Sequence, residues 1–309
     1  MSWVLDIASV EGRLPDGCAL TIGVYDGVHR GHQALLQATV EWARAHRVPA
    51  VVLTFVPHPT AVLRPEQAPR MLCVLAHRVN RLLQFGADVV VLQPFSLDFA
   101  QLSAEQFVQR VLIETLNAKA VVVGEDFRFG RQRTGTIETL RQAPDFEVII
   151  VPPVLDERGE RISSTRLRQW VLEGQLEQAQ ALLGEPFTWH GVVVLGEQRG
   201  RELGYPTANL RALEPLLLPP PGVYACRALL EGQTYPCAVS VGTPPMFPNA
   251  PGMVEAYLIG YEGEEFYGRA MALQFLMRLR AQQQFESLDA LKAQMAHDVA
   301  QAVKIVAGE

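Results

Sequence analysis

Short apolar runs rich in valine recur along the first part of the chain and constrain its fold more than any other feature. Largely continuous apolar runs of this length are typical of strands that are buried on both faces of a sheet. Helix-compatible segments separate them, and this alternation predicts an α/β domain of the Rossmann-like type with a parallel sheet. The runs occupy 18–25, 48–55, 87–95, 118–124 and 146–154, and the helix-compatible segments 33–46, 75–85, 103–116 and 135–142.

The pattern changes after residue 163. Residues 164–183 have the pattern of two helices broken at Gly174, and strand-like runs with Gly- and Pro-rich turns follow Gly184. They predict a β-barrel of about six strands, followed by a terminal helix with Ser287 as its N-cap. A chain of 309 residues exceeds the size at which a single core usually stops growing. We therefore expect two domains, residues 1–184 and 185–309.

Composition excludes several classes of protein. Hydrophobic residues make up 49% and charged residues 19%, as in an ordinary globular enzyme, and the net charge of −6 offers no basic field for nucleic acid. The four cysteines lack CxxC spacing, which favours reduced thiols over a disulfide framework or zinc knuckle. No signal peptide or membrane-spanning stretch is evident. We expect a cytoplasmic protein with no nucleic-acid or membrane partner; its oligomeric state stays open.

Residues 21–36, TIGVYDGVHRGHQALL, carry two histidines and three glycines where a strand passes into a helix. Glycines permit a tight turn and close approach of a ligand, and a helix start aims free N–H groups at an anion. His29 and His32 lie three residues apart and suit stabilisation of charge on a transferring phosphate. The alternatives are a zinc pair, for which no third ligand is nearby in sequence, and simple capping histidines. Polar segments 54–59 and 124–130 also follow predicted strands, so we expect all three at one crevice.

Several motifs now resemble a known family. GVYDGVHRGH (23–32) resembles the nucleotidylyltransferase signature in its bacterial FAD synthetase form, and TFVPHP (54–59), VGEDFRFGRQRTG (123–135) and ISSTRLRQW (162–170) agree with it. GEQRGRELGYPTANL (196–210) is similar to the riboflavin kinase motif ending in PTAN. Their order and spacing are similar to those of bifunctional riboflavin kinase/FMN adenylyltransferases along nearly the whole chain.

The resemblance implies adenylyl transfer from ATP to FMN in the first domain, giving FAD and pyrophosphate. His29 and His32 would act on the ATP phosphates, and Asp126 would contact nucleotide or flavin. The alternative for 162–166 is an ordinary helix N-cap. Phe127 and Phe129 have core positions as their alternative, and His58 has a simple turn. The implied ATP-binding residues are Gly23, Tyr25, Asp26, Gly31, Asp126, Ser163, Ser164, Thr165 and Arg166, and the flavin-binding residues are Pro57, His58, Phe127 and Phe129.

For the second domain the resemblance implies ATP-dependent phosphorylation of riboflavin. Thr207 and Asn209, two apart on an extended segment, would point the same way and serve one Mg²⁺–phosphate complex. Glu255 would be the base toward the ribityl hydroxyl, with a solvated strand residue as the alternative. Gly200, Arg201 and Gly204 would approach the phosphates of ATP.

This chain departs from the family pattern downstream of PTAN. Pro244, Pro245 and Met246 replace a usual Asn-Pro-Thr, Gly260 stands where an acidic residue is common, and Gln282 and Gln284 replace a Glu and a Lys. These changes leave three alternatives open: an adenylyltransferase whose kinase-like domain only binds flavin, another transferase of the superfamily, and a flavin sensor without turnover. We expect a working kinase with weakened affinity for riboflavin.

Overall fold

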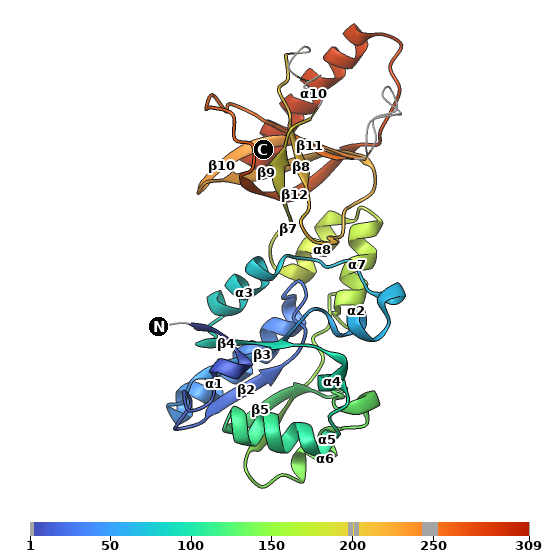
Figure 1. Ribbon diagram of the computed structural model, residues 1–309. Coiled ribbons are helices and arrows are strands. Elements are labelled where there is room, and N and C mark those ends of the chain that lie inside the picture. The colour runs from blue at the N-terminus through green and yellow to red at the C-terminus, as the bar shows by residue number, and fades with distance from the viewer. Residues whose placement is uncertain (1–2, 197–199, 201–203, 243–252, 309) are drawn as a thin grey trace. The chain divides into compact units, whose positions relative to one another are not determined.

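The structure is a computed structural model that describes residues 3–196, 200, 204–242 and 253–308. It divides into two compact units, the first formed by 1–69 and 75–163 and the second by 70–74 and 164–309 (Figure 1). In the described part, no helix is long and apolar enough to cross a bilayer. All four cysteines are buried and free, as their spacing predicts.

The first unit is built on a six-stranded sheet in the order β1-β4-β3-β2-β5-β6, and every strand pair in it is parallel. The predicted parallel sheet is thus confirmed, with one strand more than the five apolar runs. β1 was not predicted, because its run of four residues is too short to show a pattern. The strands are β1 (Trp3–Asp6), β2 (Cys18–Ile22), β3 (Ala50–Val56), β4 (Val89–Pro94), β5 (Ala118–Gly124) and β6 (Glu147–Val151).

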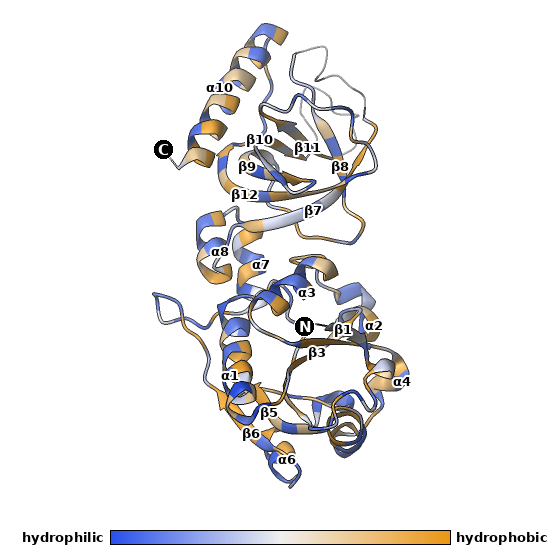
Figure 2. Cartoon of the chain, turned by 90° about the vertical axis from the view of Figure 1, so that its left-hand side faces the viewer, coloured by the Kyte–Doolittle hydropathy of each residue, from blue (hydrophilic) through white to orange (hydrophobic). Residues whose placement is uncertain are grey.

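Helices cover both faces of this sheet, which explains why its central strands are apolar throughout. On one face, Leu36 of α1 and Val79 and Leu82 of α3 pack with Val52 and Val90. The opposite face packs against the π-helical segment η3 and against α6. The sheet strands accordingly appear orange in Figure 2. The helices are α1 (Arg30–His46), α2 (Pro59–Leu63), α3 (Leu75–Gln84), α4 (Leu97–Ala100), α5 (Ala104–Gln106), η3 (Phe107–Thr115) and α6 (Ile137–Arg141), with short 3₁₀ turns η1 (Ile7–Ser9), η2 (Pro65–Gln67) and η4 (Arg131–Arg133).

The second unit contains the two predicted helices, α7 (Ser164–Leu172) and α8 (Leu176–Leu183), and a barrel. Gly174 separates the helices with a φ of +74°, a conformation that glycine adopts without strain. The six strands close in the order β10-β11-β8-β7-β12-β9, as the turn-punctuated sequence predicts. They are β7 (Phe187–Val194), β8 (Ala208–Arg211), β9 (Gly222–Leu230), β10 (Gln233–Gly242), β11 (Met253–Leu258) and β12 (Ala270–Arg280).

The terminal helix α10 (Leu288–Ala307) packs on β9, β10 and β12. Ser287 caps it by accepting a hydrogen bond from the Ala290 N–H, as predicted. Its polar and apolar residues alternate in Figure 2, as expected of a helix with one packed face. A buried ion pair joins Arg280 at the end of β12 to Asp298 of α10 at 2.8 Å. The helix is therefore an integral part of the barrel unit.

The second unit also includes residues 70–74. The Met71 N–H donates to the Pro215 carbonyl, and the Leu217 N–H donates to the Met71 carbonyl. α7 and α8 group with the barrel, since α8 contacts β7 and β12. The boundary after Gly184 stays a prediction.

Candidate functional site

The turn between β2 and α1 holds a conformation that its sequence alone would not favour. Tyr25 and Val28 have φ angles of +56° and +40°, in the left-handed region that branched and bulky residues avoid. Both side chains are fully buried among residues of α1 and α3, so packing maintains the strained backbone. The Tyr25 hydroxyl lies 2.7 Å from the Thr21 hydroxyl, which itself donates to the Val122 carbonyl at 2.9 Å. Thr21 therefore accepts from Tyr25, and burial raises the pKa of this phenol.

His29 is the N-cap of α1, and its Nδ1 accepts the His32 N–H at 3.3 Å. In the neutral ring the proton therefore lies on Nε2, which leaves that nitrogen as the donor. The rings of His29 and His32 stack, with centroids 3.7 Å apart and planes inclined by 14°. Among the described residues, no group of three or more His, Cys, Asp and Glu side chains lies together in a way that could hold a metal ion. His29 is therefore a capping histidine, as one alternative predicted. The capping hydrogen bond also links His29 to His32, whose ring stacks on that of His29.

The absence of a side chain at Gly31 leaves space for the His29 ring. A Cβ at this position would lie 3.2 Å from Cε1 and Nδ1 of the His29 ring and 3.5 Å from the Ile162 carbonyl oxygen. The close approach of Ile162 brings the chain that enters Ser163 beside the start of α1. Two of the predicted phosphate-binding segments thus meet at this point within the first unit.

The segment that follows β3 also begins a helix. The Nδ1 of His58 accepts the Thr60 N–H at 3.1 Å and caps α2, while Pro57 is exposed after a cis Val56–Pro57 peptide bond. β3 is the direct neighbour of β2 in the sheet. The TFVPHP segment therefore ends at the same sheet edge as the two histidines.

The segment that follows β5, the other neighbour of β2, contains an ion pair. Arg161 donates to Asp126 at 2.7 Å, and this hydrogen bond holds the pKa of the aspartate below its usual value. Phe127 and Phe129 stack at 5.5 Å, but Phe129 is buried in the core and contacts Phe107. The core alternative thus describes the surroundings of Phe129, while Phe127 is partly exposed. Sequence reasoning missed Arg161, because 35 residues separate it from Asp126.

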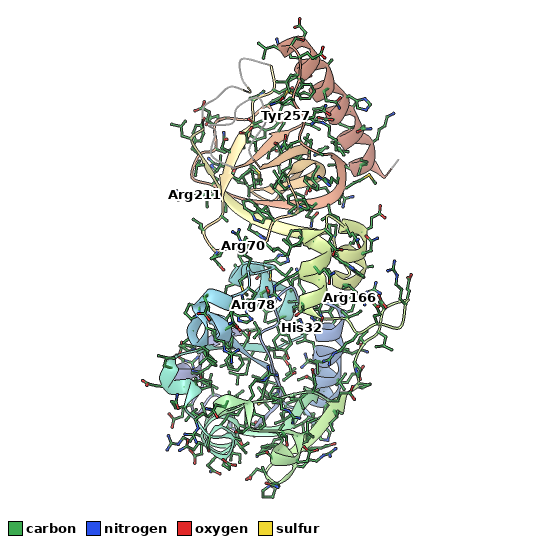
Figure 3. The ribbon with its side chains drawn as sticks, turned by 90° about the vertical axis from the view of Figure 1, so that its right-hand side faces the viewer. His32, Arg70, Arg78, Arg166, Arg211 and Tyr257 are labelled. Carbon is green, nitrogen blue, oxygen red and sulfur yellow. The ribbon has the colours of Figure 1, made fainter. Side chains whose placement is uncertain are left out.

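The ISSTR segment leads into α7, whose first residue is Ser164. Ser163 and Ser164 are partly exposed and Thr165 is exposed. The Arg166 guanidinium lies over the Trp170 ring at 4.5 Å from its centroid, and Figure 3 labels this arginine on α7. A helix start rich in hydroxyl groups suits a phosphate ligand.

In the barrel, Asn209 of β8 pairs directly with Glu255 of β11, and Glu255 pairs with Ser240 of β10. The flanking residues Leu210 and Val254 are buried in the core. Since side chains alternate along a strand, the three polar residues share the opposite, outer face. An amide, a carboxylate and a hydroxyl therefore lie side by side on three adjacent strands.

Gly196 and Gly200, which precede β8, lie against the polar residues of this face. A Cβ at Gly196 would overlap the Asn209 amide, which is 8% exposed, and a Cβ at Gly200 would lie 3.0 Å from the Thr207 hydroxyl. Gly204 has a φ of +86°. Gly196 and Gly200 thus permit close contact of their backbone with Asn209 and Thr207. The predicted site residue Arg201 lies outside the described residues.

Two further aromatic residues border the same face. Tyr205 and Tyr257 meet edge to face with centroids 5.3 Å apart, and Figure 3 labels Tyr257 on β11. Tyr257 lies two residues beyond Glu255 and so on the same side of its strand. Sequence reasoning did not single out this pair.

The departures from the family pattern have different surroundings. Gln282 donates to the Ser240 hydroxyl at 2.9 Å and to the Val241 carbonyl at 3.2 Å, so it touches the direct neighbour of Glu255. Gly260 has a φ of +76°, where an acidic residue would be strained. Gln284 is exposed. Pro244, Pro245 and Met246 lie outside the described residues.

Comparison with known proteins covers both units. The family model described as FAD synthetase matches residues 12–166, and the one described as riboflavin kinase matches residues 183–306. A solved structure described as a macrolide-efflux protein from Streptococcus pneumoniae is 34% identical, with a TM-score of 0.85 over 98% of this chain and 99% of its own. This likeness shows a shared fold.

Curated relatives match along almost their whole length. The bifunctional riboflavin kinase/FMN adenylyltransferase of Escherichia coli K12 is 38% identical over 96% of both chains. The enzymes of the same description from Pseudomonas fluorescens and Bacillus subtilis are 36% and 32% identical, over 94% and 92% of this chain and 94% and 91% of their own. The chain belongs to the family of bifunctional riboflavin kinase/FMN adenylyltransferases.

Proposed function

We propose that this chain synthesises FAD in two steps, phosphorylating riboflavin to FMN and then adenylylating FMN, with ATP as co-substrate of both. The observation that carries the proposal is the presence, in one chain, of matches to both family models over two separate compact units. Each unit holds a polar cluster suited to one of the steps. The alternative of an adenylyltransferase alone draws support from Gln282, which occupies a position next to the partner of Glu255.

In the adenylyl transfer, an oxygen of the FMN phosphate attacks the α-phosphorus of ATP, and the bond to the bridging oxygen breaks to release pyrophosphate. His29 and His32, at the start of α1, donate to phosphate oxygens as charge accumulates on them. The fixed tautomer of neutral His29 supports this role, since its Nε2 is the donor. The N–H groups at the helix start add to the same positive field.

The remaining residues of this first site bind the two substrates. Ser163, Ser164, Thr165 and Arg166 hold the triphosphate through hydroxyl groups, amides and a guanidinium. Gly23, Tyr25, Asp26 and Gly31 shape the turn that receives the nucleotide. Asp126 contacts nucleotide or flavin in its ionised form, which Arg161 favours. The flavin-binding wall consists of Pro57, His58 and Phe127, while Phe129, predicted for the same wall, stacks on Phe127 from within the core.

In the kinase step, Glu255 accepts the proton of the ribityl 5′-hydroxyl while that oxygen attacks the γ-phosphorus of ATP, and ADP leaves. The direct pairing of Glu255 with Asn209 supports this role, because it sets the base beside the phosphate-binding PTAN segment. Gly200, Arg201 and Gly204 approach the phosphates. Tyr205 and Tyr257 border this face and offer an aromatic surface to the flavin.

Thr207 and Asn209 would hold Mg²⁺ on the kinase side. Their oxygen atoms are of the hard type that Mg²⁺ prefers, and the backbone of Gly196 and Gly200 approaches both side chains closely. A site with few protein ligands fits this ion, which keeps waters and substrate phosphates in its shell. When bound, Mg²⁺ would neutralise phosphate charge.

Separate assays of the two half-reactions test the proposal. Purified protein with FMN, ATP and Mg²⁺ is expected to release FAD and pyrophosphate, and with riboflavin in place of FMN it is expected to release ADP. No FAD from FMN would overturn the adenylyltransferase, and no ADP from riboflavin would support the alternative. The boundary after Gly184 and a cytoplasmic location are further proposals, which limited proteolysis and cell fractionation test.

A further inference from the structure

A buried arginine lies beneath the turn that carries the two histidines. Arg78 of α3 is 4% exposed, and its guanidinium donates to the Val24 carbonyl at 2.7 Å. Thr54 of β3 donates to the same oxygen at 3.1 Å. The carbonyl that opens the turn is thus fixed by two side chains from two other elements. Figure 3 labels Arg78 and His32, which come from α3 and α1.

The bond to Val24 is the single hydrogen bond of the Arg78 side chain within the described residues, and its buried Nε has no partner there. A guanidinium remains charged at every pH at which proteins fold. Burying such a charge is costly unless an opposite charge or several hydrogen bonds offset it. A buried cation with one carbonyl partner is therefore retained for a reason other than stability.

The turn that Arg78 contacts indicates the role of this side chain. Val24 precedes Tyr25, and the Tyr25 ring lies 5.0 Å from the His32 ring, so fixing Val24 also fixes the wall against which the histidines rest. Arg78 therefore acts on the two histidines through the backbone of the turn.

We propose that Arg78 is a positioning residue of the adenylyltransferase: it holds the β2–α1 turn through the Val24 carbonyl, so that the turn and its histidines accept the triphosphate of ATP. The inference rests on the proposed function of this site. It assigns Arg78 no contact with substrate. Its effect is on ATP, since the turn belongs to the nucleotide side, and KM for FMN is expected to change little.

Arg78→Met and Arg78→Lys separate charge from simple packing. The Met variant keeps the length of the side chain but loses charge and donor, and we expect KM for ATP in FMN adenylylation to rise roughly ten- to hundredfold, the usual effect of losing one charge-assisted hydrogen bond. The Lys variant restores both and should stay within about threefold of wild type by the same measure. Arg44→Met, which removes the exposed ion pair to Asp88 in the same unit, is the matched control and should leave KM unchanged.

Riboflavin phosphorylation by the same preparation reports on folded, active protein and is expected to stay at the wild-type rate. The inference is overturned if Arg78→Met keeps the wild-type KM for ATP, if the Lys variant is as impaired as the Met variant, or if both activities fall together. If Arg78→Met does not fold, Arg78→Gln takes its place with the same expected loss. Wild-type protein that makes no FAD from FMN would instead overturn the proposed function, and with it this inference.

Discussion

The imidazole rings of His29 and His32 stack at 3.7 Å, and the Nδ1 of the first accepts the backbone N–H of the second. One residue therefore caps the helix and also supports the ring of the other. The buried Tyr25 ring, 5.0 Å from that of His32, limits its movement on a further side. The two histidines act as one rigid unit at the start of α1, which suits a site that must stabilise charge without rearranging.

His32→Ala is expected to lower kcat for FMN adenylylation by about 10²- to 10³-fold, the usual loss when one donor to a developing charge is removed. The rate of riboflavin phosphorylation should stay within about twofold of wild type, because the residues of the barrel unit are unaltered. Substitutions that share no partners seldom affect one another. Both rates are measured on one preparation. Loss of both activities in a folded protein would contradict the assignment of two separate sites.

Gly31→Ala separates stability from activity. Alanine is the better helix former by about 1 kcal/mol, so the melting temperature should stay constant or rise. The added Cβ would meet the His29 ring at 3.2 Å and displace it from its stack, so adenylylation should fall by about tenfold or more. Thermal unfolding and FAD formation are the two measurements. Unchanged FAD formation would show that the position of His29 does not matter.

Asn209→Ala and Glu255→Gln address the kinase. Both are expected to lower riboflavin phosphorylation, the second by about 10²- to 10⁴-fold, because glutamine cannot accept a proton. Adenylylation of supplied FMN should be unaffected, which makes it the internal control. A Glu255→Gln variant with the wild-type rate of ADP release would exclude this glutamate as the base.

Gly196→Ala tests the contact between Gly196 and Asn209. Any Cβ at this position would overlap the Asn209 amide, so either the Gly196 backbone or the amide must move. We expect KM for ATP in the kinase reaction to rise by about tenfold, an effect in the range of one lost hydrogen bond to a charged group. Steady-state kinetics with riboflavin as the fixed substrate give the value. A variant with wild-type KM would show that Gly196 does not position Asn209.

The Asp126–Arg161 pair predicts a measurable pKa. Arg161 lowers the pKa of Asp126, so in Arg161→Met this pKa should rise toward its ordinary value. Because the folded-state pKa is depressed, the pair adds stability above the pKa of the unfolded chain, and this contribution is lost as the pH falls through the folded-state pKa. NMR titration of the Asp126 carboxyl resonance in both proteins gives the shift. An identical pKa in the two proteins would contradict the pairing.

Much of the fold could be predicted from the sequence, because buried strands appear in it as continuous apolar runs. The valine-rich runs mark the central strands of the parallel sheet, and Ser287 and Gly174 mark the ends of helices. Short elements show no such pattern in the sequence. β1 has four residues, and α2 and α4 are single turns, too short for any periodicity to show.

The candidate site could be predicted only where its residues are close in sequence. His29 and His32 share one turn, and Thr207 and Asn209 share one strand entry. Arg161 reaches Asp126 across 35 residues. Arg78 lies on the apolar face of α3 with Val79 and Leu82, but its partner Val24 is 54 residues away in sequence. Such contacts depend on the tertiary structure, which no local pattern encodes.

A product time course from riboflavin shows whether one chain performs both steps. Purified protein is supplied with riboflavin, ATP and Mg²⁺, and flavins are separated at intervals. We expect FMN to form first and FAD then to accumulate at its expense. If riboflavin remains unchanged while added FMN is converted to FAD, the claim of two activities is contradicted.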